Sequence, residues 1–288
     1  MAPLPNTQGF LTVITGAAGG LGASLAREAA SMGMTVILAD IAYEAAQAQA
    51  AAITKSGGNA HAVQVDVSKP ESIAEFTKWV HENHGHPRIL INNAAVETLG
   101  LSWEVPTARW ETTMNVNIHG VVHCVQGLLP GMIESGEECW VVNVCSVGAF
   151  ISVPGQTAYL MTKHAVQAFT EGLYLEMQMM DHRVHVSTAC PGLLRTNIFH
   201  GSGSQGAPQS DDRLAKYQRH MGELAQEHGM DTGAAAQKVL EQALQGKFWV
   251  WTHEDLGSQF LKSRAEFLTD QALPSAPEGT RHLYNFDS

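Results

Sequence analysis

Tyr159 and Lys163 stand four residues apart in a segment that favours a helix, and Ser146 precedes them across a Pro-Gly break. Residues at positions i and i+4 lie on one face of a helix, so the phenol and the ammonium would be neighbours. A free tyrosine has a pKa of about 10, and a nearby positive charge stabilises the phenolate and lowers that pKa. The three side chains could hold an oxygen atom and transfer a proton, as a general acid or base does. Surface helices also carry Tyr-x-x-x-Lys pairs, so this spacing needs support from the rest of the chain.

A glycine-rich turn near the N-terminus could bind a cofactor for such a centre. The sequence TGAAGGLG, from Thr15 to Gly22, follows an apolar run and opens a helical segment. Its glycines Gly16, Gly20 and Gly22 would permit a tight turn and let backbone amides approach a pyrophosphate at the helix N-terminus. The same glycines would also suit a plain strand-to-helix turn. Because they follow the first strand of a βαβ pattern, they predict a dinucleotide site.

Asp40 ends the second expected strand and bears on the choice of dinucleotide. A carboxylate at this place can accept hydrogen bonds from the adenosine ribose hydroxyls and would repel a 2′-phosphate. The next residue is Ile41, and the glycine turn carries Ala17 and Ala18, so no arginine or lysine is available for that phosphate. These residues predict NAD rather than NADP as the cofactor. The alternative role for Asp40 is to cap the following helix.

Short β-branched runs alternate with longer helical segments, and these elements must position the polar groups. Several of the runs are almost continuously apolar, as in a parallel sheet that helices cover on both faces. The expected strands are 10–15, 35–40, 61–67, 88–93, 139–146, 184–190 and 248–252, and the expected helices are 21–32, 43–55, 70–83, 107–133 and 159–180. This order predicts an α/β fold with a doubly wound, Rossmann-like parallel sheet in a single domain. Ser146 would then lie at the carboxyl edge of the sheet, where such folds bind ligands.

We expect the domain to cover residues 1–270 and residues 271–288 to form a C-terminal tail. The Gly, Ser and Pro residues of segment 200–213 predict a mobile loop rather than a domain boundary, because further elements follow it.

Composition and charge narrow the possible partners and location. The 288 residues suffice for one large α/β domain or two small ones, and the apolar share of 44% is ordinary for a globular protein. A formal net charge of −11 argues against nucleic acid and anionic membranes as partners. The four cysteines are scattered without a CxxC pair, as expected for free thiols in a reducing compartment. The N-terminus lacks the basic region of a signal peptide, and no uninterrupted apolar run reaches the roughly 18 residues of a membrane span. We therefore expect a cytoplasmic protein.

Several motifs in order resemble the short-chain dehydrogenase/reductase family in its compact, single-domain form. The resemblance extends from Phe10 to about Trp251 and includes the Ser, Tyr and Lys spacing described above. The other matching motifs are TGAAGGLG at 15–22, VDV at 65–67, NNAA at 92–95, VNIHG at 116–120 and PGLLRT at 191–196. One departure is Ala95, which stands where the family pattern NNAG has glycine. Its methyl group would lie close to the cofactor and should not abolish binding.

The resemblance implies a role for each residue of the reaction centre. Tyr159 would be the general acid or base, and Lys163 would lower its pKa and bind the ribose. Ser146 would hold the substrate oxygen. Asn117 would hold a water molecule that links Lys163 to solvent.

It also implies which residues contact the dinucleotide. Asp66 and Val67 would contact the adenine, Asn93 would lie along the cofactor, and Leu21 would approach the nicotinamide. The backbone after Pro191-Gly192, with Thr196, would bind the carboxamide end. The implied cofactor site thus consists of Gly16, Gly20, Leu21, Gly22, Asp40, Asp66, Val67, Asn93, Tyr159, Lys163, Pro191, Gly192 and Thr196.

We expect no metal site. His119 and His123 have the i, i+4 spacing of a metal-binding pair, but no carboxylate or cysteine completes the set. The resemblance places their helix at a subunit interface and implies a homodimer or homotetramer.

Apolar residues surround the expected centre, and the resemblance implies that segment 193–230 covers the substrate. They predict a hydrophobic secondary alcohol or ketone as substrate, aromatic ones included. Some of these residues could instead only pack in the core. The candidates for the pocket wall are Val96, Leu99, Trp103, Val147, Phe150, Ile151, Val153, Leu193, Ile198, Phe199, Met221 and Met230.

Three functions remain open from the sequence. The first is an NAD-dependent alcohol dehydrogenase that transfers a hydride from the carbinol to nicotinamide. The second is a carbonyl reductase that uses the same residues in the reductive direction. The third is a dinucleotide sensor without catalysis, although a sensor would need only the glycine turn.

Overall fold

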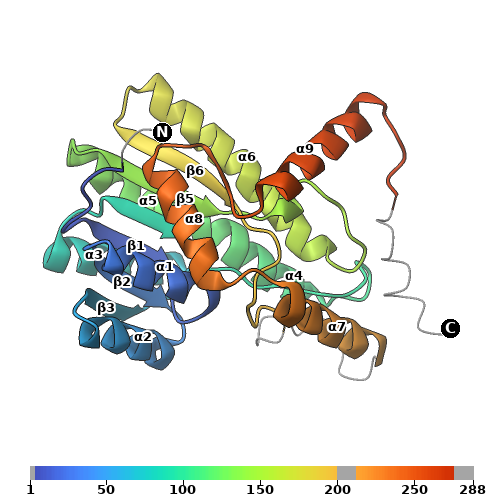
Figure 1. The fold of residues 1–288 in the computed structure, drawn as a ribbon, viewed down its shortest axis with the longest axis horizontal. Helices are drawn as coiled ribbons and strands as arrows, with labels where there is room; N and C mark the ends of the chain where they lie inside the picture. The colour runs from blue at the N-terminus through green and yellow to red at the C-terminus, as the bar shows by residue number, and fades with distance from the viewer. Residues whose placement is uncertain (1–3, 200–211, 276–288) are drawn as a thin grey trace.

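The chain folds around a seven-stranded parallel sheet with the strand order β3-β2-β1-β4-β5-β6-β7. The computed structural model describes residues 4–199 and 212–275 (Figure 1). The strands are β1 (Leu11–Thr15), β2 (Thr35–Asp40), β3 (Asn59–Gln64), β4 (Ile89–Asn92), β5 (Cys139–Val144), β6 (Val184–Cys190) and β7 (Trp249–Trp251). The predicted doubly wound, Rossmann-like α/β fold is confirmed.

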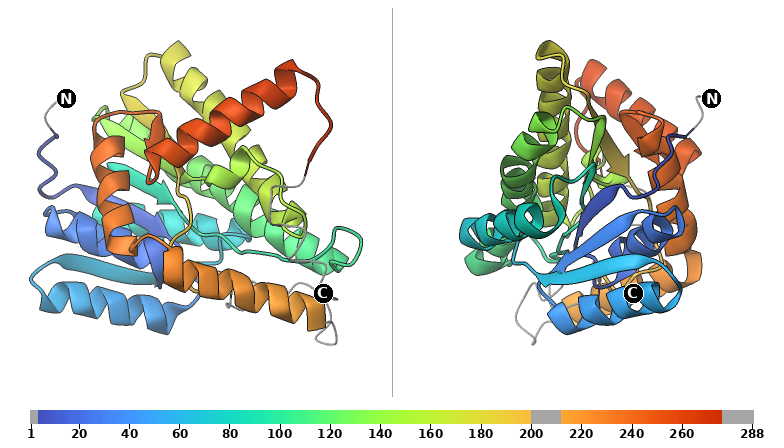
Figure 2. Two further views of the ribbon diagram at one scale, coloured as in Figure 1. Left: turned by 45° about the vertical axis from the view of Figure 1, so that its right-hand side comes forward. Right: turned by 90° about the vertical axis from the view of Figure 1, so that its left-hand side faces the viewer.

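Helices cover both faces of this sheet, as Figure 2 shows in the view along it. On one face, α1 (Gly20–Ser31), α2 (Tyr43–Lys55) and α8 (Thr232–Leu244) enclose a core with residues such as Leu25, Ile53 and Val239. On the other face, α3 (Pro70–His84), α5 (Gly120–Glu134) and α6 (Thr157–Met179) enclose a second core, which includes Phe76 and Leu128. Apolar side chains on both faces explain why the central strands read as continuous apolar runs.

The expected helix 107–133 is continuous but changes its winding where VNIHG lies. It consists of α4 (Thr107–Met114), a π-helical turn η1 (Asn115–His119) and α5. Short π-helical turns inside α-helices occur frequently at functional sites. Among the described residues, Thr107–Glu134 is the helix with the length and mean hydropathy, 1.2, of a membrane span. Half of its apolar window is buried inside the fold.

The strand order reverses between β1 and β4. The chain leaves β1 toward one side of the sheet and leaves β4 toward the other side. In open sheets of this kind, ligands bind beyond the carboxyl ends of the strands at that point. The expected strand 61–67 ends earlier, at Gln64. Asp66 and Val67 therefore lie beyond the strand, at the same edge as the glycine turn.

The segment after β6 leaves the sheet, and the chain later comes back beside Leu194. A parallel bridge joins Leu194 and Met230, and the Met230 amide donates to the Leu193 carbonyl at 3.0 Å. Between these points lies α7 (Asp212–His228), which starts within the segment 200–213 that was predicted to be a loop. Residues 200–211 of that loop lie outside the described residues. Helix α9 (Glu254–Thr269) follows β7, and of the predicted tail only residues 271–275 are described.

Candidate active site

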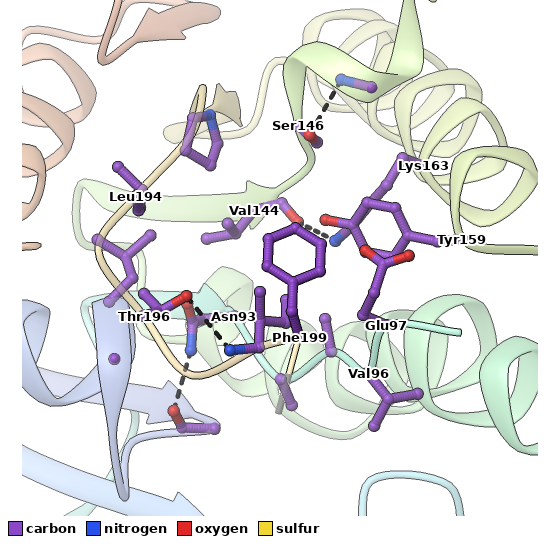
Figure 3. A pocket seen from close by; sticks show the side chains of 18 of the residues that line it. Asn93, Val96, Glu97, Val144, Ser146, Tyr159, Lys163, Leu194, Thr196 and Phe199 are labelled. Atoms are coloured by element: carbon purple, nitrogen blue, oxygen red, sulfur yellow. Dashed lines mark hydrogen bonds between the residues drawn. The ribbon is translucent and has the colours of Figure 1, made fainter. Parts of the chain in front are cut away.

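A cavity of about 860 Å³ lies at the carboxyl edge of the sheet and joins the glycine turn to the Ser, Tyr and Lys side chains. Loops after β1, β2, β4, β5 and β6 contribute to its wall, together with α7 and α9. Figure 3 shows Ser146, Tyr159 and Lys163 on one side and Asn93 and Thr196 on the other. Residues far apart in the sequence thus share one space.

The glycine turn is shaped for a close approach of backbones, as a pyrophosphate cradle requires. Gly16 has φ +65°, and a Cβ there would lie 2.7 Å from the Ala94 Cα. A Cβ on Gly22 would collide with the Gly16 carbonyl oxygen and lie 2.6 Å from the Asn93 Nδ2. Only glycine fits at these two positions without a shift of the chain. The turn therefore fits the phosphates of a dinucleotide, with the amides of the α1 N-terminus beside it.

Asn93 ties this turn to β4. Its Nδ2 donates to the carbonyl oxygens of Thr15 at 2.9 Å and Gly16 at 3.0 Å, and its own amide donates to the Thr15 hydroxyl at 3.0 Å. Asn93 therefore holds the shape of the glycine turn. Its contact with the cofactor stays a prediction.

Asp40 lines the cavity and holds two backbone amides. One carboxylate oxygen accepts from the Ala18 amide at 2.8 Å, and the other accepts from the Ala42 amide at 2.9 Å. The N-cap of α2 is Ala42, so Asp40 is not the cap residue itself. Each carboxylate oxygen has a further lone pair, so these bonds leave room for ribose hydroxyls. The cavity wall also includes Ile41.

Asp66 and Val67 line the same end of the cavity as Asp40. The Asp66 carboxylate accepts from the amide and the hydroxyl of Ser68 at 3.0 and 2.6 Å, which fixes the turn into α3. Helix α5 packs closely against this turn, because a Cβ on Gly120 would lie 2.8 Å from the Val67 side chain.

The residues predicted to bind the nicotinamide end of the cofactor are also brought together at the cavity. Leu21, Pro191, Gly192 and Thr196 all line the cavity. The Gly192 amide donates to the Thr252 hydroxyl at 3.1 Å, which fixes the backbone after β6. The structure thus brings every residue of the predicted cofactor site except Gly22 to the cavity wall, and Gly22 lies in the turn beneath it.

Ser146, Tyr159 and Lys163 meet although they lie on different elements. Ser146 follows β5 and accepts a hydrogen bond from the Gly148 amide at 3.0 Å, which orients its hydroxyl. Tyr159 and Lys163 project from the first turns of α6, and the Lys163 Nζ lies 5.4 Å from the centre of the Tyr159 ring. The ammonium also donates to the Val144 carbonyl at 2.9 Å. Its side chain is 3% exposed, so the charge is confined to the cavity.

The surroundings of Tyr159 raise its pKa, which is opposite to the direction expected from the sequence. Burial has the largest effect, Glu97 acts in the same direction, and the Ser146 hydroxyl lowers the pKa. Burial likewise lowers the pKa of Lys163, whereas Cys145 and Glu97 raise it. The sequence argument considered only the positive charge near the phenol and omitted the desolvation of the phenolate. A phenolate at Tyr159 therefore needs additional positive charge in the cavity.

Asn117 lies in the π-helical turn and binds both backbone polar groups of one residue, Val96, in the loop after β4. Its Oδ1 accepts from the Val96 amide at 2.8 Å, and its Nδ2 donates to the Val96 carbonyl at 3.0 Å and to the Thr162 hydroxyl at 3.0 Å. These bonds occupy both donors of the amide, so the side chain acts first as a clamp for this loop. The proposed water-holding role of Asn117 stays a prediction.

Glu97 is a buried acidic residue of this site that sequence reasoning missed. It follows NNAAV directly, is only 2% exposed, and lines the cavity beside Tyr159 and Lys163 (Figure 3). Burial raises the pKa of its carboxyl well above the ordinary value, and Lys163 opposes this. The sequence could have indicated Glu97, because it lies just after the NNAA motif, in a loop that was expected to lie along the cofactor.

Most of the apolar residues proposed for the pocket wall line the cavity, but four do not. Phe150 packs against Trp249 and Trp251 instead, and Leu99 is fully buried in a small core around α7. Trp103 is 79% exposed, and Met230 packs on the core beneath α1. The alternative of core packing thus holds for part of the set. The wall residues are Val96, Val147, Ile151, Val153, Leu193, Ile198, Phe199 and Met221, joined by Arg109, Gln156, Tyr217, Leu256 and Phe260, which the sequence did not indicate.

The histidine pair and the cysteines show no ligand cluster in the described part of the chain. The His119 ring contacts the Asn115 side chain at 3.0 Å, and the His123 ring contacts the Val67 carbonyl at 3.0 Å. No group of three or more His, Cys, Asp or Glu side chains in residues 4–199 and 212–275 could hold a metal. All four cysteines are buried free thiols.

A doubly wound sheet with a glycine cradle that opens onto Ser146, Tyr159 and Lys163 defines a dinucleotide-binding oxidoreductase. Residues 11–206 match the short chain dehydrogenase family, and the chain belongs to that family. Over 208 residues it is 33% identical to the meso-2,3-butanediol dehydrogenase of Serratia marcescens, with 71% of this chain and 79% of that protein covered.

Solved structures agree on the fold and differ in the bound cofactor. A short-chain dehydrogenase/reductase from Burkholderia phymatum in complex with NAD superposes with a TM-score of 0.89, at 27% identity over 95% of this chain and 99% of that one. A metagenomic short-chain oxidoreductase in complex with NADP gives a TM-score of 0.62, at 29% identity over 66% of this chain and 86% of that one. The family and the fold are thus confirmed, whereas the choice between NAD and NADP depends on this chain's own residues.

Proposed function

We propose that this protein is an NAD-dependent dehydrogenase of hydrophobic secondary alcohols. The observation that carries the proposal is that Ser146, Tyr159 and Lys163 share one cavity with the glycine cradle. Bound NAD would accept the hydride that leaves the carbinol carbon. The relationship to a butanediol dehydrogenase supports an alcohol as substrate.

Each of the three side chains has a separate task in this proposal. Tyr159 removes the proton of the substrate hydroxyl at its phenol oxygen. Ser146, whose hydroxyl is held by the Gly148 amide, keeps the substrate oxygen next to that phenol. Lys163 binds ribose hydroxyls through its ammonium and adds a positive charge that favours the phenolate. The nearby nicotinamide carries positive charge in its oxidised form and acts in the same direction.

Asp40 supports NAD as the cofactor. Its carboxylate lies at the cavity wall after β2 and would repel a 2′-phosphate, and the neighbouring Ile41 provides no cation for it. Related structures were solved with NAD and with NADP, so the proposal of NAD relies on Asp40.

The cavity wall supports a hydrophobic substrate. Ile151, Val153, Leu193 and Phe199 lie on the side of the cavity that follows Ser146 and the carboxyl end of β6. An aromatic or aliphatic group attached to the carbinol would contact these side chains. The same residues would serve a carbonyl reductase, because the reverse reaction has the same transition state.

We further propose that the protein works in the cytoplasm as a homodimer or homotetramer, with a small molecule as its partner. The proposal includes no nucleic acid or membrane partner, because a net charge of −11 disfavours binding to such anionic partners.

The substitution Tyr159→Phe tests the function directly. It removes the proton acceptor and keeps the ring, so turnover of secondary alcohols should fall by at least about 100-fold. The binding of NADH, measured by fluorescence titration, should stay within about threefold of the wild type, because the cradle is unchanged. Retained turnover in Tyr159→Phe would show that the phenol is not the acid or base.

A further inference from the structure

The carboxyl group of Glu97 is buried in the cavity wall without a partner for one of its oxygens. The residue is 2% exposed, and its Oε1 has no hydrogen-bond partner among the described residues. Figure 3 shows the carboxyl beside the Tyr159 ring and pointing into the space that Phe199 borders. A buried polar group without a partner destabilises a fold, so its presence in a cavity wall calls for a functional reason.

The loop that carries Glu97 is held firmly on both sides. Asn117 binds the amide and the carbonyl of Val96 at 2.8 and 3.0 Å. On the other side, the hydroxyls of Thr98 and Thr113 are 2.7 Å apart. The side chain of Glu97 therefore has a fixed starting point, as binding groups in preorganised sites do.

The carboxyl faces the reacting groups rather than solvent. Tyr159 and Lys163 from α6 interact with it electrostatically, and Tyr217 from α7 does so from the covering segment. All of these residues line the same cavity. A substrate that fills the cavity beside Tyr159 will therefore place the atoms next to its carbinol carbon near Glu97.

We propose that Glu97 binds a second hydroxyl group of the substrate, on the carbon next to the carbinol, so that the site is built for hydrophobic vicinal diols. This inference rests on the proposed dehydrogenase function and narrows its substrate class. Glu97 is a specificity-determining residue in this proposal, since it touches a part of the substrate that does not react.

A hydroxyl group fits this place better than an ammonium group. Burial raises the pKa of the Glu97 carboxyl and so favours its neutral form, which both donates and accepts a hydrogen bond. A hydroxyl group has the same two capacities. A cation would have to lose its water shell in an apolar cavity and would lie close to the Lys163 ammonium, which makes its binding unfavourable.

Three probe alcohols with one skeleton test the inference: 1-phenylethane-1,2-diol, 1-phenylethanol and 2-amino-1-phenylethanol. All three offer the same benzylic carbinol, and they differ only in the group on the neighbouring carbon. The wild-type protein with NAD should oxidise the diol with a kcat/KM at least about tenfold higher than either other compound, the fold-change expected when a buried group gains its hydrogen bond.

The variants Glu97→Met and Glu97→Gln separate binding from other roles. Glu97→Met removes both hydrogen-bonding capacities at similar length, so the diol preference should disappear. Glu97→Gln keeps a polar group at this place and should retain part of the preference. Glu111→Gln is the matched control, because it makes the same side-chain change on the exposed side of α4 and should keep the wild-type ratio.

The outcomes distinguish this inference from the function on which it rests. If the wild-type protein oxidises none of the three compounds, the dehydrogenase function fails for this substrate class and the inference fails with it. If it oxidises them and Glu97→Met changes the kcat/KM of diol and 1-phenylethanol by equal factors, only the inference is wrong. A preference of the wild type for the amino alcohol would also contradict it.

The melting temperature of Glu97→Met provides an independent readout. If the carboxyl is there for binding, its replacement should raise the melting temperature, because an unpartnered buried carboxyl is removed from the fold. A lower melting temperature would assign Glu97 to the stability of the loop and overturn the inference.

Discussion

At the scale of single residues, the charge balance around Tyr159 governs when its proton can leave. Two side chains in direct reach act on its pKa in opposite directions, since Glu97 raises it and Ser146 lowers it, while burial raises it most. If Tyr159 acts as the general base that we propose, the pH range of catalysis depends on its cavity and not on the ordinary pKa of tyrosine.

The pH dependence of alcohol oxidation tests this balance. Once the Glu97 carboxyl has lost its own proton at higher pH, its negative charge raises the pKa of Tyr159. Glu97→Gln removes that charge, so the pH at which kcat/KM rises should move to lower values. Ser146→Ala removes the hydroxyl that lowers this pKa, so the rise should move to higher pH. The profiles of kcat/KM against pH report free-enzyme pKa values and are the appropriate measurement. Identical profiles for both variants and the wild type would show that another group titrates.

At the scale of elements, the turn between β1 and α1 shows how tightly backbones are packed around the cradle. Gly22 in the first turn of α1 lies against the Gly16 carbonyl and the Asn93 amide. Because these neighbours are backbone atoms and a fixed side chain, they cannot move aside for a methyl group.

Gly22→Ala should therefore weaken the site and the fold together. We expect a loss of roughly 1–3 kcal/mol in stability, which is typical of overpacking, and at least about tenfold weaker NADH binding. Gly19→Ala is the stability control in the same turn, because a Cβ at Gly19 meets no atom within 4 Å. Thermal unfolding and NADH titration provide the two readouts. An unfolding temperature of Gly22→Ala equal to that of Gly19→Ala would contradict the close packing.

At the scale of the whole molecule, binding of the cofactor connects the two halves of the sheet. The cavity runs from Asp40 and Asp66 on one side of β1 to Gly192 and Thr196 beyond β6. A dinucleotide that occupies it would contact loops from both halves and would stabilise the folded chain against unfolding.

Thermal shifts with NAD and NADP test the cofactor preference without any substrate. At a concentration of about 100 times Kd, a ligand adds about 2.7 kcal/mol, so NAD should raise the melting temperature by roughly 5–10 °C. NADP at the same concentration should have a much smaller effect, because Asp40 repels its 2′-phosphate. Asp40→Ala should bring the two shifts closer together. Equal shifts in the wild type would mean that Asp40 does not select the ribose.

The sequence indicated the order of strands and helices and the motifs at the strand ends. The alternation of apolar runs with helical segments was enough for the sheet, since parallel strands buried on both faces have few other arrangements. It was less exact at the ends of elements, as β3 shows. Asp66 was placed within the expected strand, whereas the chain leaves the sheet at Gln64.

The contents of the cavity were predictable only in part. Ile151 and Phe199 line it as expected, yet Phe150 and Met230 pack elsewhere, because residue type does not show in which direction a loop side chain points. The burial of Glu97 could not be predicted either, because the composition shows it only as one of many acidic residues. Its burial depends on α6 and α7, which come much later in the chain.

Sequence alone determined which chemical groups this protein has and in what order they occur, including the glycine turn, Asp40 and the Ser, Tyr and Lys set. These follow from local spacing and from the regular geometry of strands and helices. Only the tertiary structure decided that the pKa of Tyr159 is raised and that a buried carboxyl lies beside it. Desolvation and charge interactions depend on distances between residues far apart in the chain, and those distances exist only after folding.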